Sequence, residues 1–238
     1  MADQESNQDP ARLARRLMRS CERAALATSL LGAPYVSLVL HAVDLDASPI
    51  LLLSDLAQHA RNIALDPRVS LLLDGTDDLA DRLDGPRLTL MGWAEAVADV
   101  RLRARFTARH PSSAVYAGFG DFRAYRIVVE RGHLIAGFGR IEWIDRVDLG
   151  FSSDIRVLAE AEPTTVTNMN ERYGPALDLC AQRLLGRPET GWRITNLDPE
   201  GLDLRSGNAT ARLEFPAPAL IAEAAFAALE GLAEKARL

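Results

Sequence analysis

The chain has 238 residues, of which 48% are hydrophobic and 25% charged, a balance typical of a globular protein. Its length allows one large domain or two small ones. The net charge of −6 gives no reason to expect a nucleic acid or an anionic membrane as partner. The two cysteines, Cys21 and Cys180, have no metal-binding spacing, and the N-terminus lacks a hydrophobic signal region. We therefore predict a cytoplasmic protein with buried thiols and no metal site.

The first 150 residues read as short strands with a few helices at the corners. We expect the last two of these strands to form a hairpin around Arg131 and Gly132, and Gly92 to mark a bulge or sharp bend. Strands joined mostly by hairpins predict a closed antiparallel barrel. In chain order we predict a disordered tail at 1–9, a helix at 10–23, strands at 24–30, 34–43, 50–53 and 69–73, a strand at 87–97, a helix at 98–110, and strands at 122–130 and 133–139.

The central segment, residues 50–73, is organised as strand, helix and strand. Residues 50–53 are continuously apolar, which suits a strand buried on both faces. Ser54 and Asp55 are good N-caps for the helix that follows, and Asp66 before Pro67 ends it. Polar and basic side chains near the start of this helix could hold a phosphate, although such side chains most often simply meet water.

After residue 150 the pattern changes to a smaller α–β–α domain. Helices are expected at 155–162 and 173–185, with an irregular or helical segment between them. Three short strands are expected at 192–197, 202–205 and 209–215, separated by turn residues. A strongly apolar-striped helix at 219–238 closes the domain.

The segment SDLAQHARNIALDPRVSLL at residues 54–72 resembles the FMN-phosphate segment of the pyridoxamine 5'-phosphate oxidase-like split-barrel flavoproteins. It is most similar to the haem-utilisation, or HugZ-type, branch. Four further fragments, ALATSL, PYVSLVL, RLTLMGWAEAV and DFRAYRIVVERGHLIAGFGR, resemble the same family, so the likeness covers about residues 11–150. It implies an α+β protein, with an FMN-binding split β-barrel at 10–150 and the branch's C-terminal α/β domain at 151–238.

The resemblance also implies a flavin site. The family places strand backbone beside the flavin ring at positions that match Ser37 and Leu38, and a cross-subunit contact at the position of Arg87. Ala60 stands where the family has a threonine hydroxyl. The residues implied to bind the cofactor are Ser37, Leu38, Ser54, Gln58, His59, Arg61, Asn62 and Arg87.

A haem site is the alternative that the branch raises, and haem iron usually takes a histidine ligand. The C-terminal phrase NMNERYGPAL departs from the family's M-N-x-D-H, because Arg172 and Tyr173 replace the Asp and His. Histidines in the barrel would compete with FMN for space. His110, at the end of a basic helix, is then the histidine expected to reach a surface-bound haem. We therefore expect weak or absent haem oxygenase activity.

Two functional hypotheses follow. The first is a homodimeric FMN-dependent oxidoreductase acting on a small or planar substrate. The second is a non-enzymatic module that binds flavin, haem or a protein. The chain contains no GxSxG, GxGxxG or P-loop motif, so the sequence identifies no catalytic residue.

Overall fold

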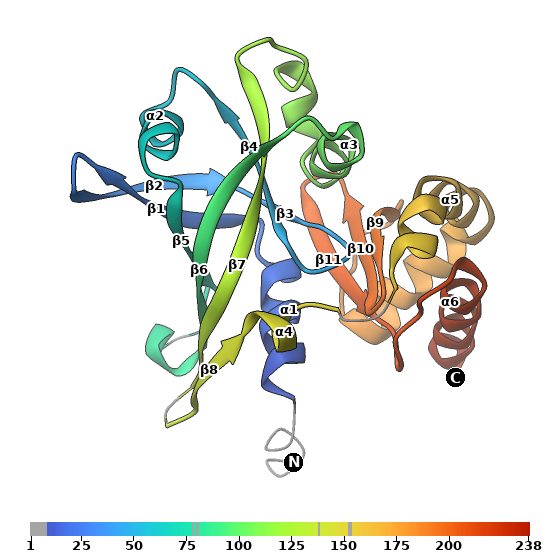
Figure 1. Ribbon diagram of the computed structural model, residues 1–238. Helices are drawn as coiled ribbons and strands as arrows, with labels where there is room; N and C mark the ends of the chain where they lie inside the picture. The colour runs from blue at the N-terminus through green and yellow to red at the C-terminus, as the bar shows by residue number, and fades with distance from the viewer. Residues whose placement is uncertain (1–8, 78, 80, 138, 152–153) are drawn as a thin grey trace. The chain divides into compact units, whose positions relative to one another are not determined.

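The computed structural model describes residues 9–77, 79, 81–137, 139–151 and 154–238. The chain divides into two compact units, a barrel unit at Met1–Phe151 and a C-terminal unit at Ser152–Leu238 (Figure 1). The predicted tail at 1–9 lies outside the described residues except for Asp9. Asp9 caps the first helix by accepting a hydrogen bond from the Ala11 amide at 3.0 Å.

The barrel unit is built on one antiparallel sheet. The strand order is β2-β1-β5-β6-β7-β4-β3, and β8 pairs with β7. The predicted α+β class and the split barrel are confirmed. The elements of this unit are α1 (Pro10–Ser20), β1 (Arg23–Leu30), β2 (Ala33–Leu40), β3 (Ala42–Val43), β4 (Pro49–Ser54), α2 (Gln58–Leu65), β5 (Arg68–Asp74), η2 (Arg82–Asp84), β6 (Pro86–Val97), α3 (Val100–Arg109), η3 (Pro111–Val115), β7 (Phe122–Ala136), β8 (Ile141–Asp145) and α4 (Arg146–Leu149).

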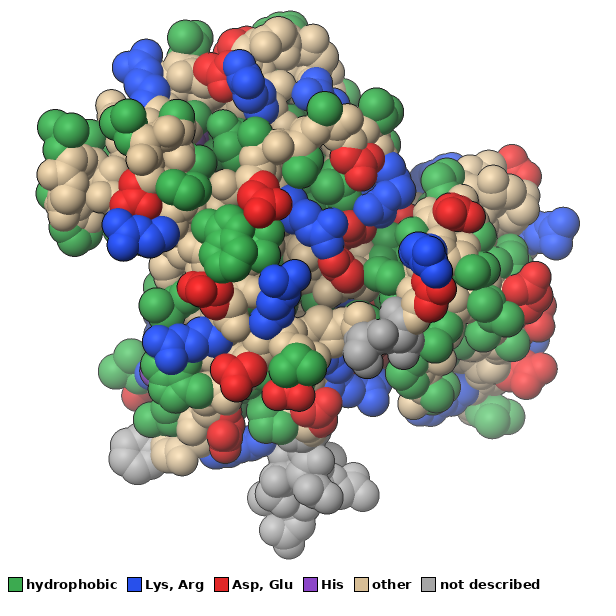
Figure 2. Space-filling model, in the orientation of Figure 1, with side chains coloured by type: hydrophobic (Ala, Val, Ile, Leu, Met, Phe, Trp, Pro, Cys, Tyr) green, Lys and Arg blue, Asp and Glu red, His purple; other side chains and the backbone are tan. Residues whose placement is uncertain are grey.

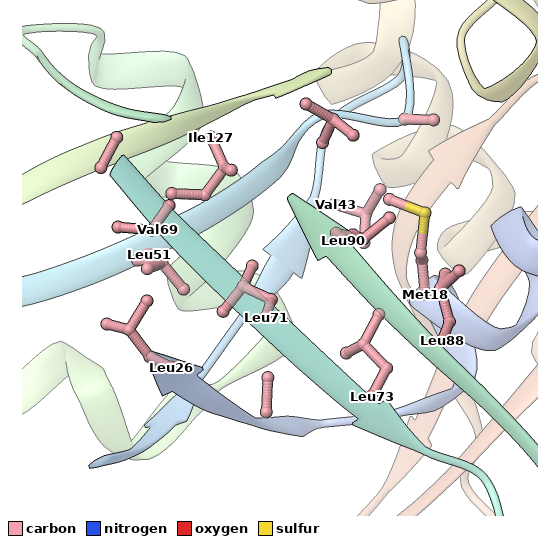
Figure 3. Close-up of a cluster of buried hydrophobic side chains, with 14 of the residues drawn as sticks. Met18, Leu26, Val43, Leu51, Val69, Leu71, Leu73, Leu88, Leu90 and Ile127 are labelled. Carbon is pink, nitrogen blue, oxygen red and sulfur yellow. The ribbon is translucent and has the colours of Figure 1, made fainter. Parts of the chain in front are cut away.

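The inner face of the sheet forms the main core of the barrel unit. Figure 3 shows Leu26, Leu71, Leu88 and Ile127 from four different strands converging with Met18 of α1. Strand β4 is buried on both faces, as predicted. Leu51 and Leu53 face the main core, whereas Ile50 and Leu52 pack in a second cluster with Leu102 and Phe106 of α3. Helix α3 therefore covers the outer face of the sheet at β4.

Strand β7 corrects the hairpin that the sequence suggested at Arg131 and Gly132. It runs unbroken from Phe122 to Ala136, and the register with β6 shifts between Met91 and Gly92. This is the bulge predicted at Gly92. Gly132 does not make a turn: a Cβ there would lie 3.1–3.4 Å from three leucine side chains. The true turn follows β7, where Gly137 and Gly139 have φ of +106° and +77°.

The C-terminal unit packs two helices with a three-stranded sheet ordered β11-β10-β9. The two helices predicted at 155–162 and 173–185 are one helix of 30 residues, and Pro163 and Pro175 lie inside it. Its polar middle is held because Asn170 binds both the N–H and the C=O of Ile194 on β9, at 2.8 and 2.9 Å. The elements are α5 (Arg156–Leu185), β9 (Arg193–Asp198), β10 (Gly201–Ser206), β11 (Ala209–Glu214) and α6 (Ala222–Arg237).

The outer face of the sheet carries exposed apolar side chains away from α3. Val36 and Leu38 on β2 are 61% and 72% exposed, and Leu72 on β5 is 42% exposed. Hydrophobic side chains gather at the tip of the β1–β2 hairpin, at the left of Figure 2. No described helix is long and apolar enough to cross a membrane.

We expect Gly92→Ala to destabilise the chain by about 1–3 kcal/mol, the usual cost of overpacking. A Cβ at Gly92 would lie 2.1 Å from the Val128 carbonyl oxygen, so the backbone of the bulge must move. Gly118→Ala is the matched control, because nothing lies within 4 Å of its added methyl. Urea unfolding followed by circular dichroism measures both variants. Equal midpoints for the two would contradict the close approach at Gly92.

Candidate functional site

Helix α2 starts later than the sequence suggested. Its N-cap is Ala57, which makes no side-chain cap bond, rather than Ser54 or Asp55. Ser54 is the last residue of β4, and its hydroxyl is used in the turn before the helix. The Ser54 Oγ accepts from the Leu56 amide at 3.1 Å and donates to Asp121 Oδ2 at 2.6 Å. The Asp121 carboxylate therefore stands beside a hydroxyl that was predicted to hold a phosphate.

Ser37 and His59 meet between β2 and α2. The Ser37 Oγ lies 3.0 Å from His59 Nδ1. Burial lowers the pKa of His59 below its ordinary 6.5, which favours the neutral imidazole. Leu38, the next residue on β2, has its side chain on the opposite, outer face of the strand. Its predicted contact with flavin thus depends on its backbone.

A chain of amide hydrogen bonds fixes α2 on β1. The Asn62 side chain is 1% exposed and donates to Thr28 Oγ1 at 2.9 Å. Gln58 Nε2 in turn donates to Asn62 Oδ1 at 2.8 Å. We call the group Thr28, Ser37, Gln58, His59 and Asn62 the α2 corner. Its polar atoms mainly bind one another, so the Asn62 amide serves first to anchor the helix.

The two predicted arginines lie apart. Arg61 is exposed on α2 and makes no hydrogen bond or ion pair with the described residues. Arg87 donates to the carbonyl oxygens of Leu83 and Gly85 at 2.8 and 3.4 Å. In the ladder between β5 and β6, Arg87 stands opposite Asp74. Asp74 lies six residues beyond Arg68, the first residue of β5, where the chain arrives from α2. Six residues of strand span roughly 20 Å.

A second polar group lies on the outer face of the sheet, and the sequence analysis missed it. His133 on β7 stands opposite Trp143 on β8, and their rings stack at 4.4 Å with an interplanar angle of 23°. The Arg131 guanidinium carbon lies 4.5 Å from the centre of the Trp143 ring. We call Arg131, His133 and Trp143 the β7–β8 cluster. Alternation along β8 was the available signal, but the false hairpin at Arg131 concealed it.

The remaining histidines are structural, and the expectation for His110 is wrong. His110 is 4% exposed, and its Nε2 lies 2.7 Å from the His41 carbonyl oxygen. His41 is 1% exposed, with Nε2 2.9 Å from the Met18 carbonyl oxygen. His110 is buried because the C-terminal end of α3 packs against the barrel unit near His41. Thr28 and Asp121 are polar partners that the sequence analysis also missed; Thr28 was detectable as a polar residue at an inward position of β1.

The residues described contain no group of three His, Cys, Asp or Glu side chains arranged to hold a metal. Of the residues predicted to bind a cofactor, the structure brings Ser37, Gln58, His59 and Asn62 together, and Arg61 and Ser54 border them. It leaves Arg87 at the other end of the strands. The assignment of these residues to a flavin stays a prediction.

We expect the imidazole of His59 to titrate below pH 6.5 in an NMR experiment, because burial disfavours its charged form. Below about pH 6.5 the unfolded chain binds more protons at this position than the folded chain. The stability that wild type gains over His59→Gln from the neutral ring is therefore complete above pH 6.5 and is lost as the pH falls through the lowered pKa. The gap in unfolding free energy should narrow from pH 7.5 to pH 5.5. A gap that widens would contradict this environment for His59.

Comparisons with known proteins place the chain in a family. The chain is 29% identical over 202 residues to the non-canonical, chloroplastic heme oxygenase HOZ of Arabidopsis thaliana, an alignment that covers 79% of this chain and 60% of that protein. The chain thus spans about 60% of the length of this curated relative. The structure of Atu2129, a protein of unknown function from Agrobacterium tumefaciens, matches with a TM-score of 0.78 and 30% identity, over 97% of this chain and 98% of that one.

A heme binding protein from Mycobacterium smegmatis matches with a TM-score of 0.58 and 28% identity, again over 97% of this chain and 98% of that one. The family model described as "CREG, beta-barrel" matches residues 5–149. These residues are the barrel unit, and the strand order is that of the split barrel. The chain belongs to the CREG family of pyridoxamine 5'-phosphate oxidase-like split β-barrels.

Proposed function

We propose that this protein binds haem and does not degrade it efficiently. The observation that carries the proposal is the similarity to the mycobacterial heme binding protein, which extends over 97% of this chain and so includes both units. The similarity to the plant heme oxygenase supports the same class of ligand. Haem, when bound, would supply electron-transfer or oxygen chemistry that the side chains lack.

The outer face of the sheet has the chemistry that haem needs. A porphyrin requires apolar surface, a cation for its propionates and an axial ligand for its iron. Ile141 and Trp143 on β8 are 58% and 55% exposed and supply the apolar surface. Arg131 and His133 stand beside them on β7. The α2 corner offers less apolar surface, because its polar side chains are bonded to one another.

We propose that haem degradation is weak because the C-terminal unit contains no histidine. Tyr173 occupies the position of the histidine in the M-N-x-D-H motif of the haem-utilisation branch. Its hydroxyl donates to Glu230 Oε1 at 2.5 Å, and this bond raises the pKa of the Tyr173 phenol. A phenol held in its protonated form is a poor iron ligand.

A titration of the purified protein with haemin tests the proposal. We expect a saturable shift of the Soret band, and little biliverdin-like absorbance when ascorbate is then added under air. A parallel titration with FMN uses flavin absorbance and fluorescence. Free haemin in ascorbate, and heat-unfolded protein with haemin, are the controls. Saturable FMN binding with no haem binding would overturn the proposal and favour the flavin alternative.

A flavin-dependent oxidoreductase acting on a small or planar substrate is the second candidate. Arg61 favours it, because this exposed cation has no partner among the described residues and lies one turn from Gln58, beside the Ser37–His59 pair. An FMN phosphate could take its charge-assisted bonds from Arg61 and His59. Asp121 next to Ser54 works against an anion there. No described residue in this region stands out as a general acid or base for such a reaction.

We also propose that the protein is a homodimer formed through the outer face of the barrel sheet. The exposed Val36, Leu38 and Leu72 side chains lie on that face. The separation of Arg87 from the α2 corner supports the same arrangement, because a flavin site that uses both would need Arg87 from a second copy. An obligate interface buries on the order of 2,000 Å² or more.

Leu38→Glu should convert this dimer to a monomer, because it places a charge in the apolar interface. The control is Leu65→Glu, since Leu65 is 78% exposed on α2 and not on the sheet. Sedimentation velocity at micromolar concentration measures both. A monomeric wild type would exclude the dimer, and a dimeric Leu38→Glu would exclude this face as its interface.

A further inference from the structure

The four histidines differ in what their ring nitrogens already bind. Those of His41 and His110 are buried, and Nε2 of each lies within 3 Å of a backbone carbonyl oxygen. His59 contacts Ser37 through Nδ1 in the α2 corner. His133 is half-buried, and neither of its nitrogens has a hydrogen-bond partner among the described residues. His133 therefore differs from the other three, because a ligand can approach either ring nitrogen without displacing a hydrogen bond to a described residue.

The surroundings of His133 fix its ring without occupying its nitrogens. The stack with Trp143, at 4.4 Å, restrains rotation of the imidazole while its edge stays open. Thr89 lies opposite His133 on the other neighbouring strand, β6, and is a small side chain. A ring held in this way loses little conformational freedom when it coordinates a metal.

Arg131 supplies a cation next to this imidazole. Its guanidinium lies over the Trp143 ring at 4.5 Å. Asp145 faces Arg131 in the β7–β8 ladder, but no ion pair joins the two, and Glu130 next to Arg131 is exposed. The charge of Arg131 is thus available to a carboxylate ligand, and the distance between neighbouring positions on a strand suits a propionate beside the iron.

We propose that the β7–β8 cluster is the haem site, with His133 as axial ligand of the iron and Arg131 pairing with a propionate. Ile141 and the edge of the Trp143 ring would supply apolar contacts to the porphyrin. This inference rests on the proposed haem binding and adds its location and ligand. It differs from the expectation drawn from the sequence, in which barrel histidines compete with a flavin, because His133 faces outward on β7, whereas the predicted flavin residue His59 meets Ser37 at α2.

The decisive experiment compares haemin with iron-free protoporphyrin IX on the full chain. His133→Ala should lose the absorbance bands of a histidine-ligated haem and weaken haemin binding by at least the ~10-fold that losing a supporting group costs at metal sites. Its affinity for protoporphyrin IX should not change, since that ligand has no iron. Retained porphyrin binding also shows that the variant is folded. His59→Ala is the matched control and should keep the wild-type spectrum and affinity.

The Arg131 contact has its own test. Arg131→Ala should weaken haemin and protoporphyrin IX alike by about two- to fivefold, the range of an exposed ion pair. It should leave binding of protoporphyrin dimethyl ester unchanged, because the ester has no carboxylate. Arg146→Ala, an exposed arginine on α4, is the control.

The outcomes separate the two proposals. If wild-type protein binds no haemin, the proposed function fails. If wild type binds haemin but His133→Ala keeps the histidine-ligated spectrum, or His59→Ala loses it, only the ligand assignment is overturned.

Discussion

The β6–β7 pairing, and the bulge in it, determines which residues of the barrel sheet meet the core and which face outward. Before the bulge, Tyr125, Ile127 and Val129 of β7 face inward. The register shift opposite Gly92 adds one residue to β7, so the inward positions become Gly132 and Leu134. His133 consequently points outward toward β8. Because a side chain at Gly92 would collide with the Val128 carbonyl, the bulge and the exposure of His133 depend on the same glycine.

The arginines illustrate why charge in a sequence is a poor guide to a ligand site. Lys235 is the only lysine, so the barrel must use arginine for every permanent cation. Several of these arginines are buried and serve as long donors to backbone: Arg105 donates to the Val43 carbonyl at 2.7 Å, and Arg109 to that of Arg19 at 2.7 Å. They hold α3, β3 and α1 together where strand pairing is short. The "basic helix" of the sequence is thus largely a structural connector, which leaves Arg61 and Arg131 as the more available cations.

Periodicity in the sequence was sufficient for most of the fold. The continuously apolar run at β4 predicted burial on both faces, and the turn residues of the C-terminal unit bounded three strands closely. Periodicity failed where two different local conformations have the same sequence pattern. At Glu130 and Arg131 the alternation of inward and outward side chains is interrupted, which fits a hairpin as well as a bulge. The Thr- and Asn-rich middle of α5 likewise fits a loop as well as a helix. Only the long-range partners, Gly92 in the first case and the β9 backbone in the second, decide between them.

The C-terminal unit shows that packing alone can account for part of a family motif, here the Met and Asn of M-N-x-D-H. In the NMNERY segment, Met169 is fully buried, and Asn170 completes the edge of β9 as a further strand would. Elsewhere on α5, Glu162 accepts from the Leu197 amide of β9, and Asp178 accepts from the Trp192 amide just before that strand. Packing therefore accounts for the asparagine and the methionine whatever the unit binds, whereas Arg172 is exposed and Tyr173 bonds Glu230 near the surface. A match at the first two positions therefore identifies the domain and by itself carries no information about a ligand.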